Sequence, residues 1–158
     1  MKVNIVNEPE KLLSAPQLKK LVQRICRYFA VKKIRNRQML LKKKELTVVF
    51  LSRAEMKTIN YQFRKKNKPT DILSFASGDP ESLGELLLCL PVLEEQAKRQ
   101  QHSLQHETAY MLIHGILHLL GYDHELSKAE EQLMFRLQDR CFEEISRLFR
   151  SNIQSNST

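Results

Sequence analysis

The sequence is poor in residues that interrupt regular structure and has no long apolar run. Of its 158 residues, four are glycine and five are proline, and tryptophan is absent. This composition argues against extensive disorder. No segment approaches the roughly 18 consecutive apolar residues that a membrane span requires, and the opening MKVNIVNEPEK lacks the apolar core of a signal peptide. We therefore expect a cytoplasmic protein with no membrane partner.

Cysteine is also scarce. The three cysteines, Cys26, Cys89 and Cys141, are an odd number and form no close pair. This pattern excludes a disulfide framework and a CxxC metal site. Because each cysteine lies in an apolar stretch, we expect buried free thiols, which suits a reducing compartment.

Negative charge is in deficit, with 18 Asp and Glu against 26 Lys and Arg, a net charge of +8. The excess favours a polyanionic partner, nucleic acid before membrane; the alternative is a basic protein without such a partner. A chain of this length can bury a core without a metal, so a metal site would serve function more than folding. We assign residues 1–150 to one domain and 151–158 to a disordered tail.

The apolar periodicity predicts a single compact α+β domain, in which a small mixed β-sheet of about four strands packs with about five helices. Strands are expected near residues 2–7, 46–51, 72–75 and 83–90. Helices are expected to start at Ser14, Ser52, Pro91, Leu104 and Ser127, three of them with serine capping boxes. Residues 32–44 are interpreted as a loop or an exposed turn of helix, and Phe63 as a core residue.

The segment MLIHGILHLLGYDHE, residues 111–125, carries the strongest chemical signal. His114 and His118 are four residues apart on a predicted helix, so both imidazoles share one face. Gly121 ends that helix and allows His124 to return. Three histidines leave a fourth tetrahedral position open, as in catalytic zinc sites, and ligand softness favours one Zn²⁺ per chain. Gly115 stands where a zinc peptidase of the HExxH type has its general base.

Two acidic residues, Asp123 and Glu125, flank the third histidine. Either could orient a ligand or handle a proton. The alternative is that both are solvated acids after a helix end.

Two segments resemble a known family. HGILHLLGYDH is similar to the HGxLHLxGYDH signature of the YbeY family of bacterial endoribonucleases, and INYQFRKKNKPTDILSF to its LNxxYRxKdxPTDVLSF segment. The strand that starts at Leu83-Gly84-Glu85 is similar to the family's LGDI strand, so the resemblance covers roughly residues 45–145.

The resemblance implies a compact α+β fold and one zinc ion bound by His114, His118 and His124. It also implies cleavage of single-stranded RNA, in maturing the 3′ end of small-subunit rRNA and in ribosome quality control. The family's basic residue near the metal corresponds to Arg64. Three positions depart from the family pattern: Glu85, Tyr110 and Gln138 replace the usual Asp, His and Glu.

Cleavage of RNA builds negative charge on phosphoryl oxygens, which a fixed guanidinium stabilises. Arg64 is the candidate, the alternative being a charge that favours a helix end. Basic residues in two clusters could contact phosphates without reading sequence, or could be solvated faces. One cluster is Lys65, Lys66 and Lys68, and the other is Lys32, Lys33, Arg35, Arg37, Lys42, Lys43 and Lys44.

The sequence thus predicts a zinc-dependent endoribonuclease whose partners are single-stranded RNA, rRNA and the small ribosomal subunit. Two alternatives stay open. One is a ribosome-assembly factor with a structural zinc and no catalytic activity. The other is a zinc peptidase, which the absence of a general base at Gly115 disfavours.

Overall fold

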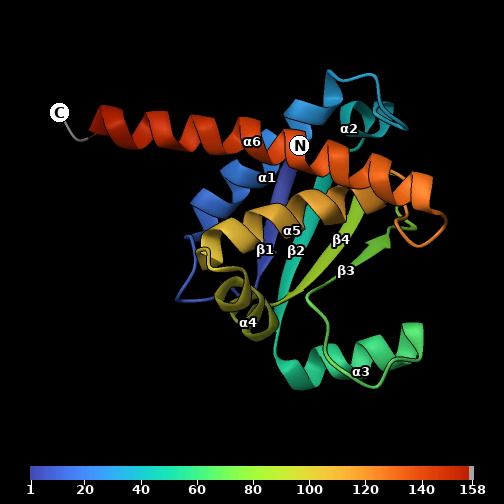
Figure 1. Cartoon of the computed structure of the whole chain (residues 1–158). Helices are drawn as coiled ribbons and strands as arrows, with labels where there is room; N and C mark the ends of the chain where they lie inside the picture. The colour runs from blue at the N-terminus through green and yellow to red at the C-terminus, as the bar shows by residue number, and fades with distance from the viewer. Residues whose placement is uncertain (157–158) are drawn as a thin grey trace.

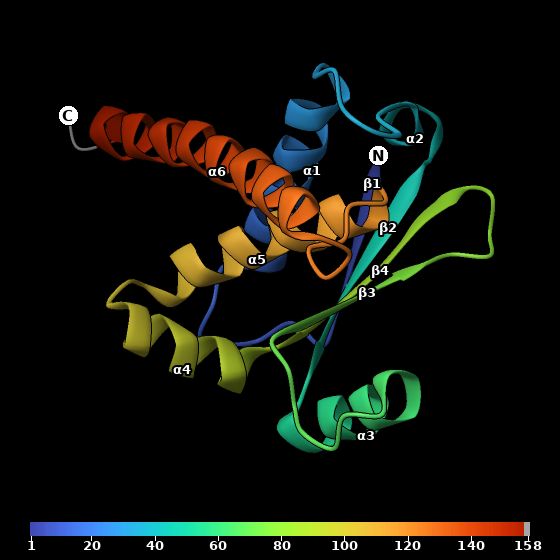
Figure 2. The same cartoon turned by 45° about the vertical axis from the view of Figure 1, so that its right-hand side comes forward.

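The computed structural model describes residues 1–156, and the side chains of residues 1–148. Four strands form one mixed sheet in the order β1-β2-β4-β3 (Figures 1 and 2). The strands β1 (Lys2–Val6), β2 (Glu45–Leu51) and β4 (Ser82–Cys89) run parallel to one another. The edge strand β3 (Ile72–Ala76) is antiparallel to β4. The predicted four-stranded mixed sheet is therefore confirmed.

The described residues form six helices, one more than predicted. They are α1 (Ala15–Ala30), α2 (Gln38–Lys42), α3 (Arg53–Arg64), α4 (Leu90–Gln100), α5 (Leu104–Leu119) and α6 (Lys128–Asn156). The additional helix, α2, is a short one within the segment interpreted as a loop or an exposed turn. Helix α6 extends through Asn156, into the segment 151–158 for which we predicted a tail, and so is longer than expected. Residues 157–158 lie outside the described part of the chain.

Serine caps begin four of these helices, α1, α3, α5 and α6. Ser14 and Ser52 each form a complete capping box with the Gln or Glu three residues later, as predicted. At α6 only half of the predicted box forms: the hydroxyl of Ser127 accepts from the backbone N–H of Glu130. The carboxylate of Glu130 pairs instead with Arg35, from a distant loop.

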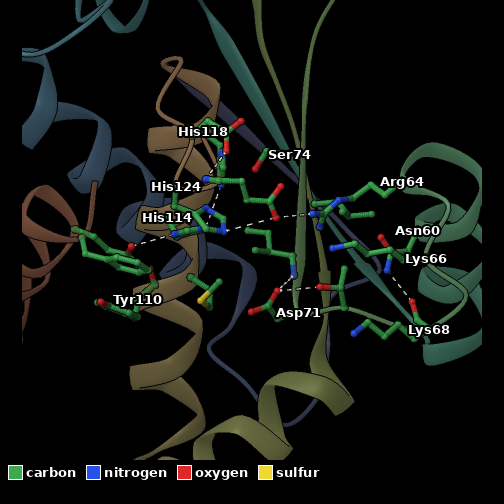
Figure 3. A pocket seen from close by; sticks show the side chains of 18 residues that line it. Asn60, Arg64, Lys66, Lys68, Asp71, Ser74, Tyr110, His114, His118 and His124 are labelled. Carbon is green, nitrogen blue, oxygen red and sulfur yellow. Dashed lines mark hydrogen bonds and ion pairs between the residues drawn. The ribbon is translucent and has the colours of Figure 1, made fainter. Parts of the chain in front are cut away.

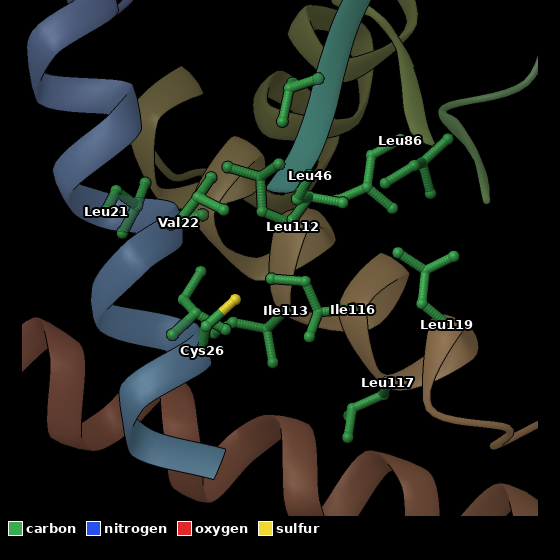
Figure 4. Packing of buried hydrophobic residues seen from close by; sticks show 14 of the residues in the cluster. Leu21, Val22, Cys26, Leu46, Leu86, Leu112, Ile113, Ile116, Leu117 and Leu119 are labelled. Carbon is green, nitrogen blue, oxygen red and sulfur yellow. The ribbon is translucent and has the colours of Figure 1, made fainter. Parts of the chain in front are cut away.

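The main core lies between the sheet and helices α1, α5 and α6 (Figures 1 and 4). Helix α5 is apolar on most sides, as expected for a helix enclosed by other elements, and Leu112, Ile113 and Ile116 on it are fully buried. Each such side chain contributes on the order of 1.5–3 kcal/mol on burial. This packing fixes α5 rigidly against the sheet.

A smaller core lies on the opposite face of the sheet, where Met56 of α3 packs against Leu73 and Leu87. The prediction that Phe63 is a core residue is wrong, since it is 61% exposed. Its ring instead makes an edge contact with Phe75, 5.0 Å between centroids. The periodicity of α3 was correct, but the helix covers only part of the sheet, so its last turn projects beyond the buried area.

The three cysteines are buried and free, as predicted. Among residues 1–156, no helix combines the length and apolarity that crossing a bilayer demands.

Candidate metal centre

Helix α5 and the turn that follows it bring three histidines together. His114 and His118 lie one helical turn apart on α5. Gly121 then adopts φ +94°, a conformation that suits glycine. The reversal returns the chain, so that one ring nitrogen from each of His114, His118 and His124 lies within 4.8 Å of the others (Figure 3). The three residues predicted as ligands therefore form a group that could hold a metal ion.

The arrangement fits a tetrahedral metal. The Nε2 atoms of His114 and His118 are 3.1 Å apart. Two nitrogens bound to one zinc at 2.0–2.1 Å would be about 3.3 Å apart. In addition, Nδ1 of His124 is buried and has no hydrogen-bond partner among the described residues, an arrangement that costs free energy unless something satisfies the atom. Three imidazoles are a donor set typical of zinc.

A glutamine from α6 orients the first histidine. The Oε1 atom of Gln138 lies 3.0 Å from Nδ1 of His114, and its Nε2 donates to the carbonyl of Tyr110 at 3.0 Å. Because the amide nitrogen is used by that carbonyl, the amide oxygen faces the imidazole and accepts its Nδ1–H. Nε2 of His114 is then left with a free lone pair toward the other histidines.

The surroundings of His114 and His118 favour the neutral form of both imidazoles, which is the form that binds metal. Burial, followed by the imidazoles of His114 and His124, lowers the pKa of His118 to about 4. Burial also lowers the pKa of His114.

A cavity of about 560 Å³ opens in front of the histidines. Arg64, Lys66 and Lys68 also line it, and Figure 3 places them across the cavity from the triad. The Nη2 atom of Arg64 donates to Oε1 of Glu125 at 3.0 Å. The same Oε1 lies 3.9 Å from Nε2 of His124. The cavity thus joins the triad to a cationic wall.

The two acidic candidates have different surroundings. Both line the cavity, and the carboxylate of Asp123 accepts the backbone N–H of Glu125 at 2.9 Å. This bond shapes the turn around His124. Glu125 is the residue whose carboxylate contacts the cationic wall.

Four of the predicted RNA-binding lysines do not line the cavity. Lys65 ends α3 in a left-handed conformation. Lys43 and Lys44 bind Pro80 and Glu81, and Lys42 is exposed at the end of α2. Lys42, Lys43 and Lys44 come just before β2, beside the start of β4. The other end of β4 pairs with Ile72 at the start of β3, which lines the cavity. The two basic clusters therefore lie at opposite ends of the sheet.

Sequence reasoning did not assign one residue that shapes the cavity, Asn60, and gave two others, Asp71 and Gln138, no defined contact with the site. Asn60 is fully buried and donates to the carbonyl of Lys68 at 2.8 Å, which fixes the loop carrying the lysines. Asp71 accepts the backbone N–H of Ile72 at 2.7 Å. Gln138 stood out in the sequence only as a departure from the family pattern. Its position as a fully buried polar residue on the apolar stripe of α6 was the signal for its contact with His114.

These features define a class: an α+β domain with a three-histidine group that could hold a metal ion, set in a partly cationic cavity. A family model described as Endoribonuclease YbeY matches residues 4–146. The chain belongs to the endoribonuclease YbeY family, as the sequence motifs predicted.

Individual relatives agree with this assignment. An Endoribonuclease YbeY of Bdellovibrio bacteriovorus is 46% identical over 143 residues, which cover 90% of this chain and 94% of the relative. One of Acinetobacter baumannii is 35% identical over 139 residues, 82% of each chain. The solution structure of TM1509 from Thermotoga maritima matches with a TM-score of 0.63 and 29% identity, and covers 96% of this chain and 93% of its own.

Proposed function

We propose that this chain is a zinc-dependent endoribonuclease that cleaves single-stranded RNA, in the maturation of the 3′ end of small-subunit rRNA and in ribosome quality control. The observation that carries the proposal is one cavity that joins three converging histidines to Arg64, Lys66 and Lys68. The family name of the relatives supports RNA as substrate. The net charge of +8 suits a polyanion.

In this proposal His114, His118 and His124 hold one zinc ion, and Gln138 keeps the first imidazole in the ligating tautomer. When bound, zinc supplies Lewis-acid chemistry at a phosphodiester. A three-histidine set leaves room for a fourth ligand from solvent or substrate, which is typical of catalytic zinc.

Arg64 grips the scissile phosphate and stabilises the charge that develops on its oxygens. Its guanidinium is held toward the cavity by Glu125, which releases it when phosphate binds. Lys66 and Lys68 contact neighbouring phosphates and position the strand without reading its bases. Glu125 then lies free beside His124, where it can accept a proton.

A zinc peptidase is disfavoured by the surroundings of Gly115. A Cβ atom at this position would lie 2.7 Å from Cδ1 of Ile72 and 2.8 Å from Cδ2 of Leu86. The position therefore faces the sheet and has no space for the glutamate that a peptidase of the HExxH type needs there.

The test is cleavage of an end-labelled RNA that spans the 3′ end of small-subunit rRNA, single-stranded or annealed to its complement. We expect the zinc-loaded protein to cleave only the single strand. His114→Ala should abolish cleavage, whereas Arg53→Ala, which alters an exposed arginine outside the cavity, should not. A parent that binds this RNA and zinc without cleaving it would favour the non-catalytic assembly factor, and equal cleavage by His114→Ala would indicate a contaminating nuclease.

A further inference from the structure

The third histidine depends on a turn that the helix alone does not fix. His114 and His118 are held by the buried helix α5, but His124 follows the helix end. The turn begins as a Schellman motif, in which Gly121 N–H donates to His118 O at 3.0 Å and Tyr122 N–H to Leu117 O at 3.1 Å. These bonds satisfy carbonyls inside the helix. The carbonyls of the turn itself still need partners.

The loop between α1 and α2 supplies those partners. Asn36 Nδ2 donates to the carbonyl of Leu120 at 3.0 Å. Arg35 Nη1 donates to the carbonyl of Gly121 at 2.7 Å, and the Arg35 backbone N–H to the hydroxyl of Tyr122 at 3.0 Å. The Arg35 guanidinium also covers the Tyr122 ring, with Cζ 4.4 Å from the centroid. Two consecutive loop residues therefore hold three consecutive residues of the turn.

The same guanidinium holds the far side of the segment that carries His124. Arg35 Nη1 lies 2.5 Å from Oε1 of Glu130, and Nη2 lies 3.3 Å from Oε2, so the pair is bidentate. Glu130 belongs to the first turn of α6, and its side chain is only 15% exposed. Arg35 thus ties together the end of α5 and the start of α6, with His124 on the segment between them.

We propose that Arg35 is a positioning residue for the metal centre, which it serves by fixing the turn that returns His124 to the other two histidines. It touches neither the metal ligands nor the cavity, so it acts entirely through Gly121, Tyr122 and Glu130. The inference rests on the metal site of the proposed function. It also separates Arg35 from the basic cluster around it, because its guanidinium is committed to internal contacts and is not free for phosphate.

The test is the Zn²⁺ dissociation constant of the full chain, measured by competition with a chromophoric chelator while the metal-free proteins are fully folded. We expect Arg35→Gln to weaken binding by about tenfold or more, the scale seen when groups that orient metal ligands are lost. Asn36→Gly keeps the left-handed backbone at this position (φ 54°) and removes only the amide, so it should weaken binding less. Arg53→Gln is the matched control, since it breaks another exposed Arg–Glu pair, on α3, and should leave the affinity unchanged.

Cobalt gives a readout of geometry. With Co²⁺ in place of zinc, Arg35→Gln should alter the visible absorption bands, which report the ligand arrangement, whereas Arg53→Gln should reproduce the parent spectrum. Parental zinc affinity and a parental cobalt spectrum in Arg35→Gln would overturn the role of Arg35. If His114→Ala also bound zinc like the parent, the metal assignment itself would fail, and the two failures are therefore distinguishable.

Discussion

Replacing Arg64 with alanine separates a role in the reaction from a role in folding. Arg64 is the last residue of α3, and its side chain is 34% exposed. Its ion-pair partner in the cavity is Glu125, itself largely exposed, at 3.0 Å. Ion pairs of this kind contribute about 0–1 kcal/mol to folding. We therefore expect Arg64→Ala to change the free energy of unfolding by less than about 1 kcal/mol and to keep its zinc.

The effect on cleavage should be much larger. Loss of one preorganised group that stabilises transition-state charge lowers kcat by about 10²–10³, or roughly 2.7–4 kcal/mol. Arg64→Lys should recover little of this activity, because an ammonium cannot grip phosphate with two parallel hydrogen bonds. The ratio of the two effects, on catalysis and on stability, is what distinguishes a catalytic arginine from a helix-end charge.

The assay measures kcat and KM separately on a single-stranded RNA, since a transition-state role lowers kcat whereas uniform substrate binding raises KM alone. Arg53→Ala is the matched control: it is an arginine at the other end of the same helix, also exposed and paired with a glutamate. Zinc content and urea unfolding are recorded for each variant. If Arg64→Ala cleaves at the parent rate with its zinc intact, the catalytic role assigned to Arg64 is wrong.

Three further predictions concern the metal, the RNA and the core. The purified protein should contain about one zinc per chain by elemental analysis, and the double variant of His114→Ala and His118→Ala should contain none; full occupancy in that variant would contradict the ligand assignment. Affinity for single-stranded RNA should fall steeply with salt, and neutralising Lys66 and Lys68 should flatten that dependence, which a salt titration by fluorescence anisotropy would measure. Burial raises the pKa of Cys26 to about 12, so its thiol should resist iodoacetamide at pH 8 until the protein is unfolded; rapid alkylation of the native protein would count against its burial.

The sequence predicted the parts of the site that are local in the chain. His114, His118 and His124 fall within eleven residues, so helix geometry and one glycine turn determine their approach. The capping boxes at Ser14 and Ser52 are equally local, and both form. Propensity and spacing are sufficient where no distant residue competes; the equally local box at Ser127 forms only in half, because Glu130 pairs with Arg35.

The contacts that sequence reasoning did not predict join distant segments. Gln138 meets His114 across 24 residues, and Arg35 meets Glu130 across 95. Arg35 lies in a segment with weak periodicity, where nothing local distinguishes a committed guanidinium from a solvated one. Phe63 shows the converse, since its helical spacing was correct but the extent of the sheet beneath α3 decided its exposure. Tertiary placement overrides a local pattern in each case.

The ion pair between Arg64 and Glu125 connects the two halves of the site before any substrate is present. One partner ends α3 and the other follows His124, so the pair bridges the cationic wall and the triad. An exposed pair of this kind is worth at most about 1 kcal/mol. In the proposed function, a phosphodiester, which offers the guanidinium two acceptor oxygens, would therefore replace Glu125 at little cost. The Arg64 guanidinium already lines the cavity, so the proposed function would require only a small rearrangement when substrate binds. This preorganisation is what electrostatic stabilisation of a phosphoryl transition state requires.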